Sequence, residues 1–569
     1  NATIHLAHIY QRIISNDTAF NIELEADIIS KEKENFDNYL KALSREGYME
    51  GVTVKSSVVS VYKLWDILVM DKYDDIDMIV MGSNGVDGIE EFFVGTNTQK
   101  FVQILFLVFI STYLCLAPSL NLLAYDSKRM VAVILVSLAL LISLLNFGKK
   151  KYYAFFIFAL NTKIKLISII LLMLFSCFFA ANQLTAFLET SFYIGLFFFC
   201  LILCKIVRDQ NQIVTLFFFI TFHTAALLYL TNFFTAFLAS FIENIPLLWP
   251  EPFSGFSNVR FFNQYQICSI TLLSLPILLY PTLDKRLINL LKFIAIGWAI
   301  LLFASGSRGA ILSVMLAMIL TLCVFKNHAK AFLKLNTLIL LTGLIIYLIL
   351  FKLIPFYFDN QVTMDWRPSD SFVRTNNRIA LWQFAIQYIK DNPWLGIGPM
   401  HYAYYPGPTN AHPHNSLLQW ACEMGIPSTV LLISLVFSAL VAWVKKFYRL
   451  NKENKQYAPP HLWIALFCSI CSGLIYSVVS GVIVMPLSQI MMTLIAGWML
   501  GLYFQDKAQK PATQLQNISF KLFAGATLIT LTYTILPSLL PRLTDYSGLL
   551  DHNYTTIAPR FWQIGGIPH

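Results

Sequence analysis

The sequence predicts a mainly α-helical membrane protein that crosses a bilayer many times and begins with a small, incomplete α/β domain. Of the 569 residues, 57% are hydrophobic and only 13% are charged, whereas soluble domains carry about 25% charged residues. From residue 101 onward, apolar runs of about 18 or more residues recur, and each can cross a hydrocarbon core of roughly 30 Å. We therefore expect membrane insertion to be directed by the helices themselves.

The apolar runs between residues 101 and 540 predict a bundle of about thirteen membrane helices. They are expected at residues 101–122, 130–147, 163–181, 190–206, 213–231, 265–281, 288–304, 309–325, 335–355, 427–445, 462–482, 486–504 and 518–537. Lys and Arg gather in short clusters between the runs, as is typical of cytoplasmic loops. With residues 1–100 in the cytoplasm, nearly every cluster falls on the inner side, and the exception, Lys128-Arg129, is expected to face outward.

The distribution of the basic residues indicates whether the chain binds nucleic acid or membrane lipid. The net charge of +9 could indicate nucleic acid, but no basic stripe with interleaved aromatic residues is present. We therefore expect membrane lipid and no nucleic acid as a partner. The nine cysteines lie mostly in apolar runs and have no zinc-ligand spacing, so they predict neither a disulfide framework nor a metal centre.

Residues 1–100 differ in composition from the rest, because they are charged and mixed. Residues 3–10 alternate like a buried strand, a second strand begins at Gly51, and a third covers residues 77–82. Helical stretches separate the three strands. Strands that alternate with helices predict a parallel sheet.

The third expected strand ends in a glycine-rich turn, where Gly82, Gly85, Gly95 and Thr96 have the spacing G-x2-G-x9-G-[S/T]. Glycines let a backbone approach phosphates, and a helix N-terminus supplies N–H donors. The segment resembles the nucleotide-binding branch of the universal stress protein family, which implies ATP as a ligand. That family has an additional strand at each end, so a truncated domain that binds no cofactor is the alternative.

Three segments fall on the expected outer face: residues 232–264, the turn Ser305–Gly309, and a long loop at residues 356–426. Loops of this length are usually functional. Arg308 lies in the turn, at the membrane boundary, where a guanidinium can fork onto phosphate oxygens. The alternative is an arginine that reaches to the interface and binds carbonyls.

The long loop contains an amphipathic helix that is expected to begin at Asn377 and to end before Pro393. Arg378 stands in its first turn, where a cation opposes the helix dipole unless an anion is also bound there. Arg374 lies one turn earlier and could share this role.

Further along the loop, His412 and His414 flank a proline directly before a helix. A histidine titrates near neutral pH and can accept a proton from an attacking hydroxyl, so a general base is the leading interpretation. A metal pair would need a third ligand that is not close by in the sequence. A surface histidine without a function is the other alternative.

The order of these motifs resembles the O-antigen ligase family, which includes O-antigen polymerases and bacterial protein O-oligosaccharyltransferases. The resemblance extends over about residues 100–540. The motifs that carry it are Ser-Arg-Gly at 307–309, Arg-x-x-x-Trp at 378–382, Leu-Gly-Ile-Gly-Pro at 395–399, His-Pro-His-Asn-Ser-x-x-Gln at 412–419 and Glu-x-Gly-Ile at 423–426. Residues 480–489 also resemble the ligase branch. Departures are the α/β domain in front and an outward tail at residues 541–569.

The resemblance implies transfer of a glycan from undecaprenyl pyrophosphate to an acceptor hydroxyl on lipid A-core or protein. The reaction would take place on the periplasmic face of a bacterial inner membrane, without metal or nucleotide. His414 would be the base, and Arg308 and Arg378 would hold the pyrophosphate. Further substrate-binding candidates are Arg260, Arg374, His412 and Glu423.

Two other functions are left open by the sequence. An O-antigen polymerase of the same fold would join repeat units to one another. A transporter regulated by a nucleotide-binding front domain would place charged residues inside its helices, and the sequence has few there.

Overall fold

The structure is a computed structural model. It describes residues 2–11, 34, 52–61, 96–115, 120, 122–145, 154–247, 252–253, 255–362, 375–405, 407–408, 410–455, 458–507, 512–544, 559–565 and 567. The chain divides into two compact units, residues 1–101 and 102–569.

The first unit contains two strands, β1 (Ala2–Gln11) and β2 (Val52–Val61), which pair in parallel. Their positions coincide with the first two strands expected from the sequence. The third expected strand, with Gly82, Gly85 and Gly95, lies outside the described residues, and Thr96 is the first residue of α4. The likeness to universal stress proteins therefore stays a prediction.

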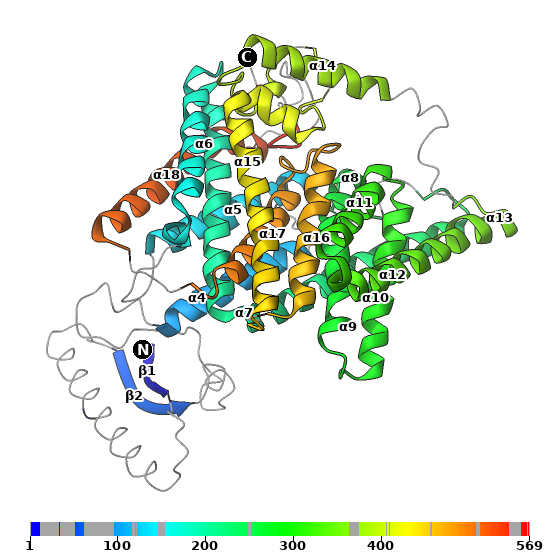
Figure 1. Ribbon diagram of the computed structural model, residues 1–569, viewed down its shortest axis with the longest axis horizontal. Helices are drawn as coiled ribbons and strands as arrows, with labels where there is room; N and C mark the ends of the chain where they lie inside the picture. Colours follow the sequence, from blue (N-terminus) through cyan, green and yellow to red (C-terminus); the bar gives the residue numbers. More distant parts are fainter. Residues whose placement is uncertain are drawn as a thin grey trace, which may run out of the picture. The chain divides into compact units, whose positions relative to one another are not determined.

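The second unit is helical, as predicted, and ten stretches of the described residues are long and apolar enough to cross a membrane. Figure 1 shows how the helices are arranged. They are α4 (Thr96–Cys115), α5 (Ala124–Leu145), α6 (Leu160–Phe179), α7 (Gln183–Glu243), α8 (Val259–Leu273), α9 (Leu275–Leu279), α10 (Lys285–Ala304), α11 (Arg308–Phe325), α12 (Lys330–Leu348), α13 (Ile354–Tyr357), α14 (Thr375–Asp391), α15 (Ser416–Lys452), α16 (Pro460–Ser477), α17 (Pro486–Tyr503) and α18 (Gln514–Thr544).

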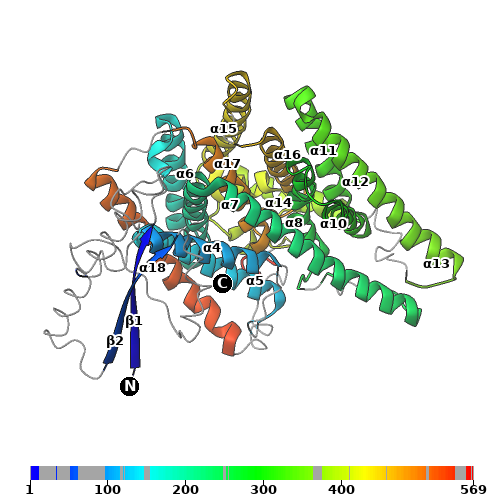
Figure 2. The same cartoon turned by 90° about the horizontal axis from the view of Figure 1, so that it is seen from below.

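The thirteen expected helices correspond to ten continuous stretches in the described residues. Two pairs of expected helices each form one stretch, and one expected helix is too short to count. The helices expected at 190–206 and 213–231 form α7, the long helix in Figure 2, which is interrupted by a non-helical backbone at Gln210. Only a short 3-10 turn separates α11 from α12, so they count as one stretch. The apolar part of α4, Val102–Cys115, is too short to count.

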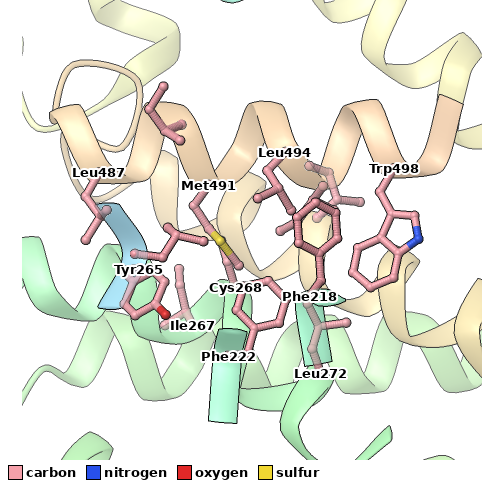
Figure 3. Packing of buried hydrophobic residues seen from close by; sticks show 14 of the residues in the cluster. Phe218, Phe222, Tyr265, Ile267, Cys268, Leu272, Leu487, Met491, Leu494 and Trp498 are labelled. Carbon is pink, nitrogen blue, oxygen red and sulfur yellow. The ribbon is translucent and has the colours of Figure 1, made fainter. Parts of the chain in front are cut away.

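The core lies where α17 packs against α7 and α8, with α16 beside them. Figure 3 shows Leu487, Met491 and Trp498 of α17 above the side chains of Phe218 and Cys268. These four helices are mostly buried in the protein, whereas most residues of α6, α12, α15 and α18 are not buried. Helices that are apolar all round are buried in protein or lipid, so these less buried helices are the ones suited to contact a bilayer.

Lys128 and Arg129, which were expected on the outer side, are both buried in the bundle. The side of the membrane on which they lie stays a prediction. The Lys128 ammonium lies over the Phe256 ring. The Arg129 guanidinium donates to the Gln489 side chain at 2.6 Å and to the Val484 carbonyl at 2.5 Å. A buried guanidinium is tolerated when its donors are satisfied in this way.

Candidate functional site

Two segments of the long loop lie together at one end of the bundle, α14 and the 410–415 segment that leads into α15 (Figure 1). The helix expected from Asn377 is confirmed as α14, which ends at Asp391 before Pro393. The Trp382 indole N–H donates to the Pro413 carbonyl at 3.0 Å. Because Pro413 separates the two histidines, this bond ties them to the helix that carries Arg378.

The backbone fixes His414 at the start of α15. Its φ of 54° lies in the left-handed region, which is uncommon for residues other than glycine. Its N–H donates to His412 Nδ1 at 3.2 Å. The next residue, Asn415, caps the helix by accepting from the N–H groups of Leu417 and Leu418 at 3.0 and 3.1 Å. Helix capping of this kind satisfies donors that have no partner within the helix.

His414 is neutral at neutral pH. Burial, followed by the nearby positive charges of Arg260 and Arg378, lowers the pKa of His414 from its ordinary value to about 3. Burial and Arg260 lower the pKa of Arg378 in turn. These shifts mean that an imidazole with a free lone pair lies close to two guanidinium groups.

The two arginines lack a negative partner, since neither forms an ion pair in the part of the chain that the structure describes. Two like charges held near one another are unfavourable unless an anion binds between them. Guanidinium groups are well suited to the oxygens of phosphate. The arrangement of Arg260 and Arg378 can therefore bind a phosphorylated ligand beside His414.

The turn that contains Arg308 is connected to this cluster through Tyr476. The hydroxyls of Ser307 and Tyr476 are 3.1 Å apart, and a Cβ added at Gly309 would lie 3.2 Å from the Tyr476 ring. Tyr476 in turn interacts electrostatically with Arg378. The side chain of Arg308 is exposed, so it is open to a ligand in the same region.

Two of the expected substrate-binding residues are buried. His412 is 4% exposed and packs on Gly481, where an added Cβ would lie 2.4 Å from its ring. Glu423 is 1% exposed, and its carboxylate accepts from Arg560 at 2.6 Å. Both side chains therefore support the loop from inside. Arg374 lies outside the described residues.

The sequence interpretation missed Arg560, Glu189 and Tyr476. Glu189 was visible as a single acidic residue in an apolar run, which is a signal for a buried partner. Arg560 gave no such signal, because it lies in a mixed segment after the last helix. Tyr476 is one of many aromatic residues in the helices.

The glycines of the Leu-Gly-Ile-Gly-Pro motif let the loop lie directly on α15. Gly396 has a φ of +71°, and an added Cβ would lie 2.4 Å from the Glu423 backbone. The N–H of Ile397 donates to the Cys422 carbonyl at 2.8 Å, and that of Gly398 to the Glu423 carbonyl at 3.1 Å. These bonds meet α15 just before Gly425, where its backbone is non-helical.

Gly396→Ala is expected to lower the free energy of unfolding by about 2–5 kcal/mol, because it adds left-handed strain and an overlap with backbone that cannot move aside. Thermal unfolding in detergent measures this. Gly525→Ala is the matched control, since its Cβ would lie 3.5 Å from Leu144 and alanine favours a helix. Equal unfolding temperatures for the two variants would contradict the expectation.

Metal chemistry has no obvious ligand set in this region. Within the described part of the chain, no three His, Cys, Asp or Glu side chains are grouped so that they could hold a metal ion. His412 and His414 have ring centroids 4.3 Å apart, but no third such side chain joins them among those residues.

A comparison with known families matches part of the chain. Residues 293–433 match a family model described as O-antigen ligase. The matched range includes Arg308, Arg378, His412 and His414, and it excludes Arg260 and the segment around residue 560. No curated protein matches the chain. The match supports the O-antigen ligase family and indicates a membrane glycan transferase.

Proposed function

We propose that the protein transfers a glycan from a lipid diphosphate carrier, undecaprenyl pyrophosphate, to an acceptor hydroxyl. His414 would be the general base, and Arg260 and Arg378 would bind the diphosphate, with Arg308 beside them. The observation that supports this most directly is the neutral His414 imidazole next to two guanidinium groups that have no carboxylate partner in the described structure. A base and an anion site are the two parts that this reaction needs.

The chemistry follows from the charges that develop. The acceptor oxygen forms a bond to the anomeric carbon as its proton passes to the His414 imidazole. The bond from that carbon to the phosphate oxygen breaks, and the lipid diphosphate leaves with the electron pair. Fixed positive charges stabilise the charge that grows on the leaving group, and a positioned imidazole removes the proton.

Donor binding also prepares the base. In the free protein, burial lowers the pKa of His414 most, and Arg260 and Arg378 lower it further. A bound diphosphate offsets both positive charges, so the part of the shift that comes from the two arginines is removed and the pKa of His414 rises above its value in the free protein. His414 therefore becomes a stronger base only when the donor is in place.

The acceptor and the side of the membrane are part of the proposal. The distribution of Lys and Arg between the apolar runs favours a cytoplasmic N-terminal unit, with the His414 end of the bundle on the periplasmic side of the inner membrane. Lipid A-core or a protein would supply the hydroxyl. The family match supports a lipid-linked glycan as donor.

The test is a reconstituted assay. The purified protein is placed in liposomes with an undecaprenyl pyrophosphate-linked glycan and, separately, lipid A-core or a pilin-like protein as acceptor. Glycan attached to one acceptor, with undecaprenyl pyrophosphate released in equal amount, supports the proposal. Joining of donor glycans to one another would instead identify a polymerase, and no release with any acceptor would contradict the proposal.

The pH dependence gives a further prediction. The pH profile of kcat/KM reports the free protein, and its acid limb is expected well below pH 6.5. The acid limb of the kcat profile reports the protein with bound donor. It is expected at a higher pH, because the donor raises the pKa of His414. Arg378→Met should move the kcat/KM limb toward pH 6.5, because it removes one of the charges that lower that pKa. Lys390→Met, at the exposed end of α14, should leave it in place.

Unfolding must be followed in the same pH series. The unfolded histidine binds a proton below about pH 6.5, whereas the folded one binds it only near pH 3. The contribution of His414 to stability is therefore lost progressively as the pH falls from about 6.5 toward 3. An activity loss that follows the unfolding curve in every variant would contradict the assignment of the limb to His414.

A further inference from the structure

The segment at residues 559–565, which we call the C-terminal clasp, is buried in the bundle. It is part of the tail expected on the outer side at residues 541–569, and that side of the membrane stays a prediction. Arg560, Phe561 and Trp562 are 0%, 3% and 4% exposed. The Tyr125 hydroxyl donates to the Arg560 carbonyl at 2.6 Å, and Arg129 Nε donates to the Phe561 carbonyl at 2.7 Å. Arg129, near the start of α5, therefore holds the backbone of the clasp.

The Arg560 side chain joins two helices that are far apart in the sequence. Its Nη2 atom lies 2.8 Å from a carboxylate oxygen of Glu189 in α7 and 2.6 Å from one of Glu423 in α15. All three side chains are almost fully buried. Removing one member of a buried ion pair leaves an uncompensated charge in the interior, which is strongly destabilising. Arg560 therefore fixes the position of Glu423.

Hydrogen bonds connect Glu423 to the long loop. Its carboxylate accepts from the Tyr402 N–H at 3.2 Å, and the Tyr402 hydroxyl donates to the Leu381 carbonyl in α14 at 2.8 Å. The next residue of α14, Trp382, bonds to Pro413 between the two histidines. A continuous set of hydrogen bonds thus runs from the clasp to both segments of the site.

We infer that Arg560 is a positioning residue, through which the C-terminal clasp holds His414 and Arg378 in register with one another. The role in catalysis rests on the proposed function. Neither catalytic group touches Arg560 in this network. The clasp lies outside the residues that the family model matches.

The first test uses Arg560→Lys, which keeps the charge but replaces the planar guanidinium by a compact ammonium on a shorter side chain, so that the geometry at the two carboxylates is lost. Hydrogen exchange of the full-length protein is measured for peptides that cover residues 396–403. Exchange there is expected to be at least tenfold faster than in the wild type, because the N–H groups of Gly398 and Tyr402 depend on Glu423. In the reconstituted assay, kcat should fall at least tenfold, with less than a threefold change in donor KM.

Lys446→Arg is the matched control, because Lys446 is a buried cation like Arg560 and lies on α15, the helix that carries Glu423. It pairs with Asp506 and lies roughly 30 Å along the helix from the kink at Gly425. Its variant should exchange and turn over like the wild type. Unchanged exchange at residues 396–403 in Arg560→Lys, or an equal loss of kcat in Lys446→Arg, would overturn the inference.

A second variant covers the case in which Arg560→Lys does not fold. Arg560→Met combined with Glu189→Gln and Glu423→Gln leaves no buried charge unpaired, so normal amounts are expected in the membrane. Its loop should still exchange faster and its kcat should stay low, and normal values of both would refute a positioning role. If the wild type transfers no glycan at all, the proposed function fails, while the exchange data still decide whether the clasp holds the loop.

Discussion

Replacing His414 by asparagine is expected to lower kcat for glycan transfer by about 10²–10⁴-fold, the usual contribution of a general base. Asparagine tolerates the left-handed backbone that His414 adopts, so the fold of the loop is retained. Its amide, however, cannot take up the proton of the acceptor hydroxyl. The measurement is single-turnover transfer from lipid diphosphate-linked glycan by purified, folded protein.

The control for this variant is His328→Asn. His328 is exposed in the short turn between α11 and α12 and packs beside Phe447 and Tyr448, in a part of the bundle that has no role in the proposal. Full activity is expected. If His414→Asn kept more than a tenth of the wild-type rate, the assignment of His414 as the base would be wrong.

Arg378→Met is expected to lower kcat/KM for the donor by about 10²–10³-fold, as is typical when one preorganised charge donor is lost. At the same time, the variant should unfold at a higher temperature than the wild type. Arg378 lies near Arg260, which lowers its pKa, and neither is paired with a carboxylate in the described structure. Removing one of two repelling charges therefore stabilises the free protein while it weakens donor binding.

Opposite effects on activity and stability are the signature of a site kept for function and not for folding. A double-mutant cycle with Arg260→Met extends the test, because two groups that bind one diphosphate should be strongly non-additive. Lys390→Met supplies the control on the same helix. If Arg378→Met changed neither donor turnover nor unfolding temperature, the anion site would lie elsewhere.

The local features of the site were accessible from the sequence. α14 was predicted by its apolar spacing and its Asp-Asn-Pro end, and a helix was expected directly after His414. In both cases the signal lies within a few residues of the element, where capping and proline chemistry act. The same is true of most membrane helices, since length and hydropathy are local properties.

Long-range pairing was not accessible in this way. Arg560 is separated from Glu189 by 371 residues and from Glu423 by 137, and no spacing pattern links such positions. Glu423 was therefore expected to bind substrate, although its side chain is buried and pairs with Arg560. Likewise, only the folded bundle shows that Lys128 and Arg129 are buried and that Arg129 binds backbone carbonyls.

The order in which these partners are made has a consequence for biogenesis. Synthesis proceeds at about 5–20 residues per second, so Glu189 and Glu423 enter the membrane at least several seconds before Arg560 exists to neutralise them. Until then, two acidic groups must stay hydrated or protonated, and α7 and α15 cannot close around them. The end of the bundle that holds His414 is therefore completed only after Arg560 has been translated.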